Sequence, residues 1–493
     1  MMVSMALTPT LSDRPRVLVV GGGYVGLYVA MKLQKKVKAH GGIVTVVDPL
    51  PYMTYQPFLP EVAGGQIEAR HAVVSHRKHL PDAELISGSV TAIDHANHKA
   101  VIAPAAGDPF EIEYRDVVVA AGAITRTFPI PGLADQGIGL KTIEEAVALR
   151  NKVLERIETA SLMTDGAARK RALTFAVVGG GFAGIEAITE IQDMARAAVA
   201  KNDRLEASDV RFVLIEAMGR IMPEVTEEQA LWVIDHMRSR GIEVLLNTSL
   251  ANAEGGLLKL INMADKSPAQ EFEADTLIWT AGVQANPMVR STDFNIEPRG
   301  RVTTGADLRI VDAEGNPLEG AWAAGDVAAV PDLTGGLPDG TCVPNAQHAV
   351  RQAKRLAKNL YAARYGVGSI KEYKHKNLGA VAGFGSWKGV AKVLGIKLKG
   401  WPAWMAHRGY HGMAMPTFER KFRVVSGWFW SLFFNRDMTR ISDLDNPRRQ
   451  FVEAATPKPK PAEKPAGVEA KAPAPVEPAA QPAAKPAGAP VKQ

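Results

Sequence analysis

Two glycine-rich turns have the residue types and spacing that phosphate binding requires. Gly21, Gly23 and Gly26 form GxGxxG directly after the apolar run RVLVV, at the start of an expected helix. In such a turn the first glycine allows a tight bend, the second lets backbone approach a pyrophosphate, and the third lets helix pack on strand. The helix N-terminus then faces the phosphates. Asp48 ends the next expected strand, so its carboxylate can accept hydrogen bonds from ribose hydroxyls.

The same pattern occurs a second time. Gly179, Gly181 and Gly184 follow the run LTFAVV, and Glu216 ends the following strand. One GxGxxG can be an ordinary flexible turn, but two copies, each with strand, helix and distal acid, predict paired dinucleotide sites. The carboxylate of Glu216 repels a 2′-phosphate, so the second site is predicted to prefer NADH over NADPH. Arg220 would weaken that preference, and we expect it to be a surface or helix-start residue instead.

Three more turns follow apolar strands. YRDVVVAAGA and DTLIWTAGV each end in an Ala-Gly turn, at Gly122 and Gly282, and GAWAAGDVAAV places Gly325 and Asp326 after a third strand. An aspartate at that point can hold the ribityl chain or pyrophosphate of FAD, whereas the alternative is an ordinary turn aspartate. Beside the two fingerprints, the flavin role is favoured.

The elements that must position these residues form two strand–turn–helix–strand units, which start about 155 residues apart. Their strands are continuous apolar runs, as expected for buried parallel strands. This pattern predicts an α/β fold with two Rossmann-like dinucleotide-binding domains, a discontinuous FAD domain into which an NADH domain is inserted. A length of 493 residues with 46% apolar residues suits two or three packed cores.

We predict five segments along the chain. Residues 14–145 and 286–375 form the two parts of the FAD-binding domain, and residues 146–285 form the NADH-binding domain. Residues 376–450 form a C-terminal membrane-associating region. Residues 451–493, rich in Ala, Pro and Lys, form a disordered tail, because they cannot bury enough apolar surface to order themselves.

The C-terminal region is basic and aromatic. Residues 371–440 hold 13 Lys or Arg against 3 Asp or Glu, whereas the net charge of the whole chain is +6. Basic side chains interleaved with Trp favour the surface of an anionic bilayer. No DNA or RNA motif is present, so nucleic acid is not an expected partner. The alternative is that the aromatic side chains complete a soluble core or a dimer interface. The residues that carry the membrane prediction are Trp401, Trp404, Trp428, Trp430, Lys397, Lys399, Arg408, Arg420, Lys421, Arg423, Arg436 and Arg440.

Cys342 is the single cysteine, so the chain has neither an internal disulfide nor a redox CxxC pair. This predicts a reducing compartment and excludes mechanisms that need a cysteine pair. The first residues lack the apolar run of a secretory signal, and no window of 18 apolar residues predicts a membrane span. His71, His76 and His79 lack the spacing of metal ligands, and we predict no metal.

The order of these motifs resembles the flavoproteins with two dinucleotide-binding domains, in which the first site takes FAD and the second takes NAD(P)H. Further sequences narrow the resemblance: PYMTYQPFLPEVAGG at 51–65 follows the first acid, and AQHAVRQ at 346–352 fits AQxAxxQ. Together with the aromatic, basic region they resemble type II NADH dehydrogenases, the single-subunit NADH:quinone oxidoreductases. The resemblance covers roughly residues 15–450.

The resemblance implies roles for four polar residues. Gln347 and Gln352 would lie by the isoalloxazine ring and the quinone pocket, and Glu186 near the nicotinamide and the flavin. Lys376 matches a family lysine near the quinone head, although its local sequence HKNLGAV departs from the family pattern. From the residues alone, both glutamines could be solvent-exposed, and Glu186 could be an acid that stabilises a helix N-terminus.

These observations together predict a FAD-dependent enzyme that oxidises NADH and reduces a membrane quinone by two electrons, without pumping protons. The predicted location is the cytoplasmic face of the cell membrane, with peripheral attachment to anionic phospholipid. The alternative is a membrane-docked NADH-sensing flavoprotein whose electron transfer is incidental. The sequence leaves open which quinone is used and whether the chain forms a homodimer.

Overall fold

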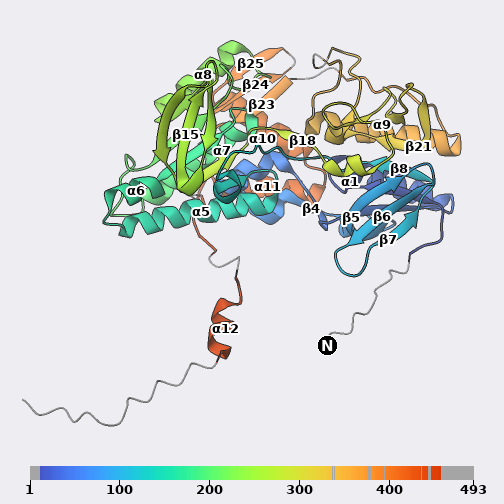
Figure 1. Cartoon of the computed structure of the whole chain (residues 1–493), viewed down its shortest axis with the longest axis horizontal. Helices are drawn as coiled ribbons and strands as arrows, with labels where there is room; N and C mark the ends of the chain where they lie inside the picture. Colours follow the sequence, from blue (N-terminus) through green and yellow to red (C-terminus); the bar gives the residue numbers. More distant parts are fainter. Residues whose placement is uncertain are drawn as a thin grey trace, which may run out of the picture. The chain divides into compact units, whose positions relative to one another are not determined.

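The structure is a computed structural model that describes residues 11–335, 337, 339–375, 379–393, 395–434, 436–441 and 446–456 (Figure 1). Its contacts divide the chain into two units, Met1–Arg440 and Ile441–Gln493. The described part of the second unit includes the helix α12 (Arg449–Ala455). The disordered tail was predicted to begin at residue 451, but residues 451–455 are helical, because they belong to α12. The predicted tail from residue 457 onward and Lys376 lie outside the described residues.

The larger sheet of the first unit has the strand order β20-β21-β8-β1-β2-β5-β6-β7, and its strands from β21 to β5 run parallel. All residues of β1 are buried, as the run RVLVV predicts for a central parallel strand. Helices α1 and α9 pack against each other and against this sheet (Figure 1). The elements are β1 (Arg16–Val20), α1 (Tyr24–Ala39), β2 (Ile43–Asp48), β5 (Glu84–Asp94), β6 (Lys99–Pro104), β7 (Phe110–Glu113), β8 (Asp116–Val119), β20 (Arg309–Val311), β21 (Pro317–Ala323) and α9 (Ala346–Tyr365).

The smaller parallel sheet has the order β10-β17-β11-β12-β13. Alternate residues of β11 enter different cores: Phe175 and Val177 belong to the main core with α7, whereas Ala176 and Val178 pack against the antiparallel sheet β14-β15-β16. The elements are β10 (Gly137–Gly139), α5 (Ile143–Leu162), α6 (Gly166–Ala172), β11 (Thr174–Val178), α7 (Phe182–Val199), β12 (Arg211–Ile215), α8 (Glu227–Ser239), β13 (Ile242–Leu245), β14 (Thr248–Asn252), β15 (Leu257–Asn262), β16 (Pro268–Glu273) and β17 (Thr276–Trp279).

The chain leaves the larger sheet and returns to it through two paired strands. Strand β9 (Ala123–Thr125) pairs antiparallel with β18 (Val283–Ala285), so the smaller sheet is an insertion into the larger one. Strand β10 precedes residue 146, the predicted start of the inserted domain, yet it pairs with β17. The smaller sheet therefore begins before that predicted boundary.

The C-terminal region through residue 440 belongs to the first unit. Strand β23 packs on α7, β24 packs on α10, and the side-chain amide of Gln229 on α8 donates to the carbonyl of Ala391 at 3.0 Å. Among the described residues, no helix has both the length and the apolar character needed to cross a bilayer. The elements are β23 (Gly379–Gly383), β24 (Gly389–Val393), β25 (Ile396–Lys399), α10 (Trp401–Ala414) and α11 (Phe418–Trp430).

Short elements connect the sheets. Within the motif PYMTYQPFLPEVAGG, every residue of α2 is buried and the helix packs against α5 and α7. The short elements are β3 (Tyr52–Thr54), η1 (Gln56–Phe58), α2 (Leu59–Ala63), η2 (Ala69–Ala72), β4 (Val73–Ser75), α3 (His76–His79), α4 (Leu133–Gln136), η3 (Glu254–Gly256), η4 (Pro287–Ser291), β19 (Val302–Thr303), η5 (Gly325–Val327) and β22 (Ala328–Ala329).

Candidate functional site

The first glycine turn joins β1 to α1 with very little space. Gly21 has φ +97°, and a Cβ there would lie 2.6 Å from the carbonyl oxygen of Ala120. A Cβ on Gly26 would lie 1.8 Å from the carbonyl oxygen of Gly21. Around Gly23 a Cβ would meet no atom within 4 Å. The turn is therefore closed on its strand side and open at Gly23, where a phosphate can approach the backbone.

Asp48 has a structural partner in this turn. Its Oδ2 accepts from the backbone N–H of Gly22 at 2.6 Å, and its Oδ1 accepts from that of Leu50 at 2.7 Å. Burial raises the pKa of Asp48 above its ordinary value, although these two N–H groups oppose the shift. The carboxylate thus holds the turn in shape, and its predicted contact with a ribose stays a prediction.

The second turn repeats this geometry. Gly179 has φ +115°, and a Cβ on Gly184 would lie 1.9 Å from the carbonyl oxygen of Gly179. Glu216 accepts from the N–H groups of Gly180 and Met218, as Asp48 does from their counterparts. The recurrence of the acid-to-glycine bond explains why both fingerprints end in a distal acid.

Arg220 does not pair with Glu216. Its Nη2 donates to the carbonyl oxygen of Val225, five residues further along the chain. This backbone contact fits the expected structural role for Arg220 and leaves the carboxylate of Glu216 without a neutralising guanidinium from that residue.

A cavity of about 610 Å³ lies against the first turn, and we call it the glycine-turn cavity. Gly325 has φ +78° and a Cβ there would lie 2.8 Å from Val25, so the Gly-Asp turn needs its glycine to pack on α1. Burial raises the pKa of Asp326, and Lys141 opposes the shift. The predicted site residues that line this cavity are Gly21, Gly23, Asp48, Gly122, Gly325 and Asp326.

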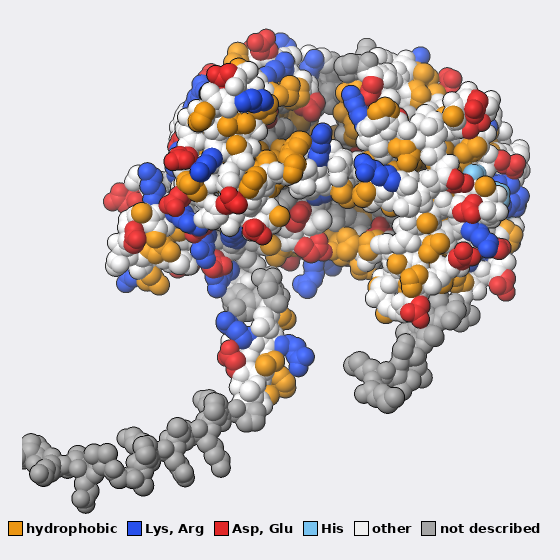
Figure 2. Space-filling model, viewed as in Figure 1, with side chains coloured by type: hydrophobic (Ala, Val, Ile, Leu, Met, Phe, Trp, Pro, Cys, Tyr) orange, Lys and Arg blue, Asp and Glu red, His pale blue; other side chains and the backbone are white. Residues whose placement is uncertain are grey.

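A second cavity, of about 500 Å³, adjoins the first and is called the Glu186 cavity. Glu186, Gly282 and Gln347 line it, and Lys141 and Ala346 line both cavities. Gly179, Gly181, Gly184 and Glu216 are not in its lining. Figure 2 shows the surface hollowed between the lobe of β15 and the lobe of α9.

A third cavity, of about 420 Å³, is called the tyrosine cavity because Tyr24, Tyr28, Tyr55 and Tyr410 line it. It shares Pro57, Ala346, Gln347, Tyr410 and His411 with the Glu186 cavity. The first residue of α9, Ala346, therefore borders all three cavities.

The side chains of the two predicted glutamines lie at different places in the structure. Gln347 lines the Glu186 and tyrosine cavities, where its Oε1 lies 3.2 Å from Nε2 of His375. Gln352 is buried, lines none of the three cavities, and its Oε1 accepts from the N–H of Gly325 at 2.8 Å. Gln352 therefore holds the Gly-Asp turn, whereas the resemblance implied a place near a quinone. Five residues along a helix is too far for both side chains to share one face.

Glu186 is a buried acid and not a solvent-exposed helix-end acid. It is 8% exposed, its Oε1 accepts from the N–H of Gly383 at 3.1 Å, and the same oxygen lies 3.4 Å from Nε2 of His407. Burial lowers the pKa of His407, but the nearby carboxylate of Glu186 outweighs burial, so the pKa lies above its ordinary value.

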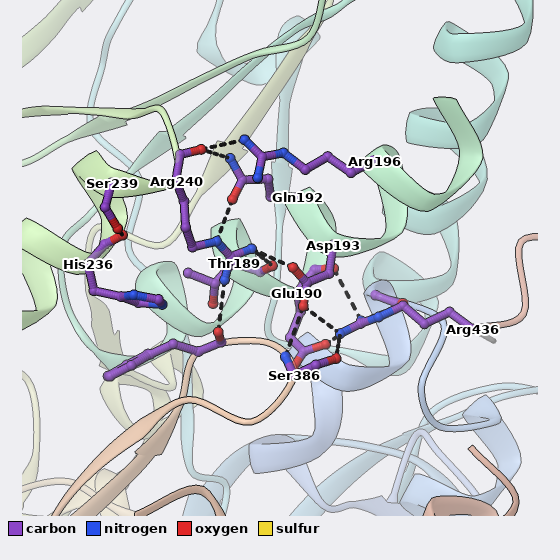
Figure 3. Close-up of polar contacts among 12 residues, drawn as sticks. Thr189, Glu190, Gln192, Asp193, Arg196, His236, Ser239, Arg240, Ser386 and Arg436 are labelled. Carbon is purple, nitrogen blue, oxygen red and sulfur yellow. Dashed lines mark hydrogen bonds and ion pairs between the residues drawn. The ribbon is translucent and has the colours of Figure 1, made fainter. Parts of the chain in front are cut away.

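A buried ionic network continues along α7 (Figure 3). Glu190 and Asp193 follow Glu186 on the same side of the helix, and Arg436 pairs with both, at 2.5 and 3.0 Å. Arg240 reaches Asp193 from the end of α8 and donates to the carbonyl oxygen of Phe384. The network fastens α7 to the C-terminal segment.

This packing corrects part of the predicted membrane region. Trp404, Trp428, Arg408 and Arg436 are buried, so they cannot meet lipid headgroups in this structure. Trp428 donates from Nε1 to Glu61 at 2.8 Å, and the guanidinium of Arg408 lies over both indole rings. The alternative that aromatics complete a core thus holds for two of the four tryptophans.

Two predicted cations have protein partners at the surface. Lys397 and Lys399 both pair with Glu228 on α8. The apolar side chains of this region that remain exposed are Trp401, Met405, Met413, Phe418, Phe422, Val425, Phe429, Trp430, Leu432, Phe433 and Phe434.

Sequence reasoning missed three residues of the site: Tyr55 and His411, which line the cavities, and His407, which lies beside Glu186. The two histidines are four residues apart on α10, a spacing that places both on one helix face. Tyr55 lies inside the quoted motif at 51–65. The sequence HRGYH was the available signal, but only the packing of α10 on α2 and α7 reveals that this face is buried.

The comparisons with known proteins agree with this arrangement. A family model described as pyridine nucleotide-disulphide oxidoreductase matches residues 15–353. A type II NADH:quinone oxidoreductase of Mycobacterium tuberculosis is 26% identical over 438 residues, which cover 87% of this chain and 89% of that protein. One from Staphylococcus saprophyticus is 27% identical over 395 residues, with 79% and 92% covered.

A solved structure, the NDH2 of Plasmodium falciparum in complex with NADH, superposes with a TM-score of 0.78 and 18% sequence identity. The match covers 87% of this chain and 100% of that one. At this identity the likeness shows the fold, and the predicted α/β class with Rossmann-like sheets is confirmed.

Proposed function

Because the chain belongs to the pyridine nucleotide-disulphide oxidoreductase family, we propose that it is a FAD-dependent NADH:quinone oxidoreductase. In this reaction NADH gives up a hydride, and a membrane quinone receives two electrons and becomes a quinol. Two curated relatives with this named activity match most of the chain. Disulfide chemistry within one chain is excluded, because Cys342 has no second cysteine to pair with.

The observation that carries the proposal is the meeting of three cavities at Ala346. The glycine-turn cavity suits FAD, since Gly21 and Gly26 let the turn pack closely on its strand while the backbone at Gly23 stays open to a phosphate. FAD, when bound, supplies the two-electron chemistry that side chains lack. The helix N-terminus of α1 would face the pyrophosphate, and Asp326 would hold the ribityl chain.

The other two cavities suit the two substrates. The Glu186 cavity adjoins the first turn of α7, where a dinucleotide would place its phosphates, and we assign it to the nicotinamide end of NADH. The tyrosine cavity combines aromatic walls with the amide of Gln347, which can donate to a quinone oxygen. Glu216, whose carboxylate the N–H groups of Gly180 and Met218 hold at the second turn, would repel a 2′-phosphate and so favour NADH over NADPH.

The membrane contact is assigned to the exposed apolar side chains of α10 and α11. Phe422, Phe429 and Phe433 are 66%, 52% and 69% exposed, which is unusual for large apolar residues that lie so close together along a chain. Met413, Met415 and Lys421 from the same region line the tyrosine cavity, so a quinone tail in the bilayer would reach it from this side. The cytoplasmic face of the cell membrane is the proposed side.

The enzyme assay tests the proposal and separates it from an NADH-sensing role. The purified protein should contain noncovalent FAD that acid precipitation releases, and it should oxidise NADH rapidly only when a menaquinone or ubiquinone analogue is added. Bound FAD with NADH binding but no quinone-dependent turnover would favour the sensor.

A separate flotation experiment tests the membrane contact. The variant Phe422→Ser/Phe429→Ser should lose binding to anionic liposomes and keep its FAD. A matched variant on another exposed apolar residue, Leu162→Ser, should float like the wild type, since Leu162 lies on α5. Unchanged flotation of the phenylalanine variant would place the membrane contact elsewhere.

A further inference from the structure

We propose that Glu186, His407, His411 and Tyr55 form a proton relay that connects the Glu186 cavity with the tyrosine cavity. The inference rests on the proposed function, because reducing a quinone to a quinol adds a proton to each quinone oxygen. In the balanced reaction NADH, one proton and the quinone become NAD⁺ and the quinol. The second proton therefore has to come from solvent and reach an apolar, aromatic cavity.

The four side chains form a continuous series of contacts. Oε1 of Glu186 lies 3.4 Å from Nε2 of His407. The rings of His407 and His411 stand one turn apart on α10, with centroids 4.6 Å apart. Nδ1 of His411 lies 3.0 Å from Oη of Tyr55. Glu186 lines the Glu186 cavity, Tyr55 lines the tyrosine cavity and His411 borders both, so each end of the series lies at a cavity.

All four side chains of the relay are buried, and burial of polar groups in this number favours a functional role. Exposed fractions are 8% for Glu186 and His411 and 4% for His407 and Tyr55. Buried polar groups are costly unless they are satisfied, and two adjacent buried imidazoles are a costly choice for a helix face that could be apolar. A neutral imidazole can accept a proton at one nitrogen while it releases a proton from the other, which suits it to transfer.

The charges around the relay give the two histidines different proton affinities. Burial lowers the pKa of His407, but Glu186 raises it above its ordinary value. Burial lowers the pKa of His411 well below its ordinary value, and the charge of His407 lowers it further. His407 therefore holds a proton more tightly than His411 does. The titratable and charged groups facing the relay are Glu61 from α2, Glu190 from α7, Arg408 and Tyr410 from α10, Tyr24 and Tyr28 from α1, Arg351 and Lys354 from α9, and Lys421 from α11.

A small enclosed space supports the Glu186 end of the relay. Its volume is about 10 Å³, close to that of a single water molecule, and Glu61, Glu186, Glu190, His407 and Arg408 line it. These side chains offer more polar partners than one buried water needs. Such a water would hold the carboxylate of Glu186 and the imidazole of His407 in position, 3.4 Å apart.

The transfer steps balance. The O–H bond of Tyr55 breaks as its proton moves to a reduced quinone oxygen, and Oη of Tyr55 takes a proton from Nδ1 of His411. His411 regains a proton from His407. The carboxylate of Glu186 then takes up a proton from solvent in the Glu186 cavity and passes it to His407, so that the starting state is restored. Tyr55 is the catalytic residue of this series, and His407 and His411 are positioning residues that act through it.

The test compares acceptors that differ in proton demand. Tyr55→Phe and His411→Gln should slow reoxidation of the enzyme by a water-soluble quinone by on the order of 100-fold, the range of general acid catalysis. Flavin reduction by NADH in stopped-flow, and turnover with ferricyanide, which takes electrons without protons, should stay within about twofold. The solvent deuterium isotope effect on quinone reduction should rise in both variants, because proton delivery becomes limiting.

A matched control uses another buried tyrosine–histidine pair. Oη of Tyr114 lies 3.2 Å from Nδ1 of His95, and neither residue lines the three cavities. Tyr114→Phe should behave as wild type with both acceptors.

Three results would overturn the relay: quinone reduction by Tyr55→Phe and His411→Gln at the wild-type rate, equal losses with quinone and ferricyanide, or an unchanged isotope effect. If the wild-type protein itself fails to reduce quinone, the proposed function is overturned as well. Failure of the relay is therefore seen in the variants, and failure of the proposed function is seen in the wild type.

Discussion

Arg436 provides the most direct test of the buried ionic network. Its side chain is 7% exposed and lies between two carboxylates of α7, with Nη1 on Glu190 and Nη2 on Asp193 (Figure 3). Nη1 also donates to the carbonyl oxygen of Gly64 at 3.0 Å. Arg436→Met keeps an unbranched apolar stem and removes the charge. The side chain of Glu190, itself 5% exposed, is then buried without its cation.

The structure sets the size of the effect. Removing one partner of a buried ion pair costs about 3–5 kcal/mol, because the remaining charge stays buried and uncompensated. Arg440 offers a matched comparison: it lies 3.7 Å from Glu155, and the two side chains are 37% and 42% exposed. An exposed pair contributes about 1 kcal/mol or less, so Arg440→Met should barely change the free energy of unfolding.

The loss of unfolding free energy in Arg436→Met should depend on pH. Burial already raises the pKa of Glu190, although Arg436 opposes the shift, so removing Arg436 raises that pKa further. A carboxyl group whose folded pKa exceeds its unfolded value binds a proton more readily in the folded state. The contribution of such a group to the free energy of unfolding is therefore most favourable below its unfolded pKa, and it is lost as the pH rises through its folded pKa. The variant should be nearly as stable as wild type at low pH and less stable than wild type as the pH approaches neutrality.

Urea unfolding followed by tryptophan fluorescence, at pH 5 and pH 8, measures both effects. The double variant Glu190→Gln/Arg436→Met should recover a large part of the loss, since position 190 no longer carries a buried charge without its cation. The reasoning is refuted if Arg436→Met and Arg440→Met lose the same stability, or if the deficit of Arg436→Met is equal at the two pH values.

Four further substitutions test the assigned sites. Gly26→Ala should abolish FAD retention, because the new Cβ would lie 1.8 Å from the carbonyl oxygen of Gly21; a yellow protein with full flavin absorbance would contradict this. Glu216→Gln should narrow the preference for NADH over NADPH, mainly through KM, and equal use of both nucleotides by wild type would show that Glu216 does not select. Gln347→Ala should slow reoxidation by quinone and spare flavin reduction, whereas Gln352→Ala should weaken flavin retention, since Gln352 holds the Gly-Asp turn. Stopped-flow half-reactions and flavin content separate these outcomes, and identical phenotypes would mean that the two side chains serve one site.

The sequence by itself determined the two dinucleotide folds. A tight turn between strand and helix needs positive φ and no Cβ, and these are local requirements that a glycine meets wherever the chain goes. Gly21 and Gly179 have that φ, at +97° and +115°. Continuous apolar runs likewise dictated the buried parallel strands, because only a strand covered on both faces buries every side chain.

Only the tertiary structure decided which polar side chains reach the cavities. Gln347 and Gln352 belong to one motif, yet the helix rotates them apart, and the partner of Gln352 is 27 residues away in the sequence. The basic and aromatic C-terminal region has a composition suited to a membrane, but Trp428 and Arg436 find carboxylates on α2 and α7, more than 240 residues earlier. Composition reports what a side chain can do in water or lipid. Whether it is buried depends on long-range packing, which brings His407 and Arg408 of α10 against Glu186 of α7 and Glu61 of α2 and places His411 at two cavities.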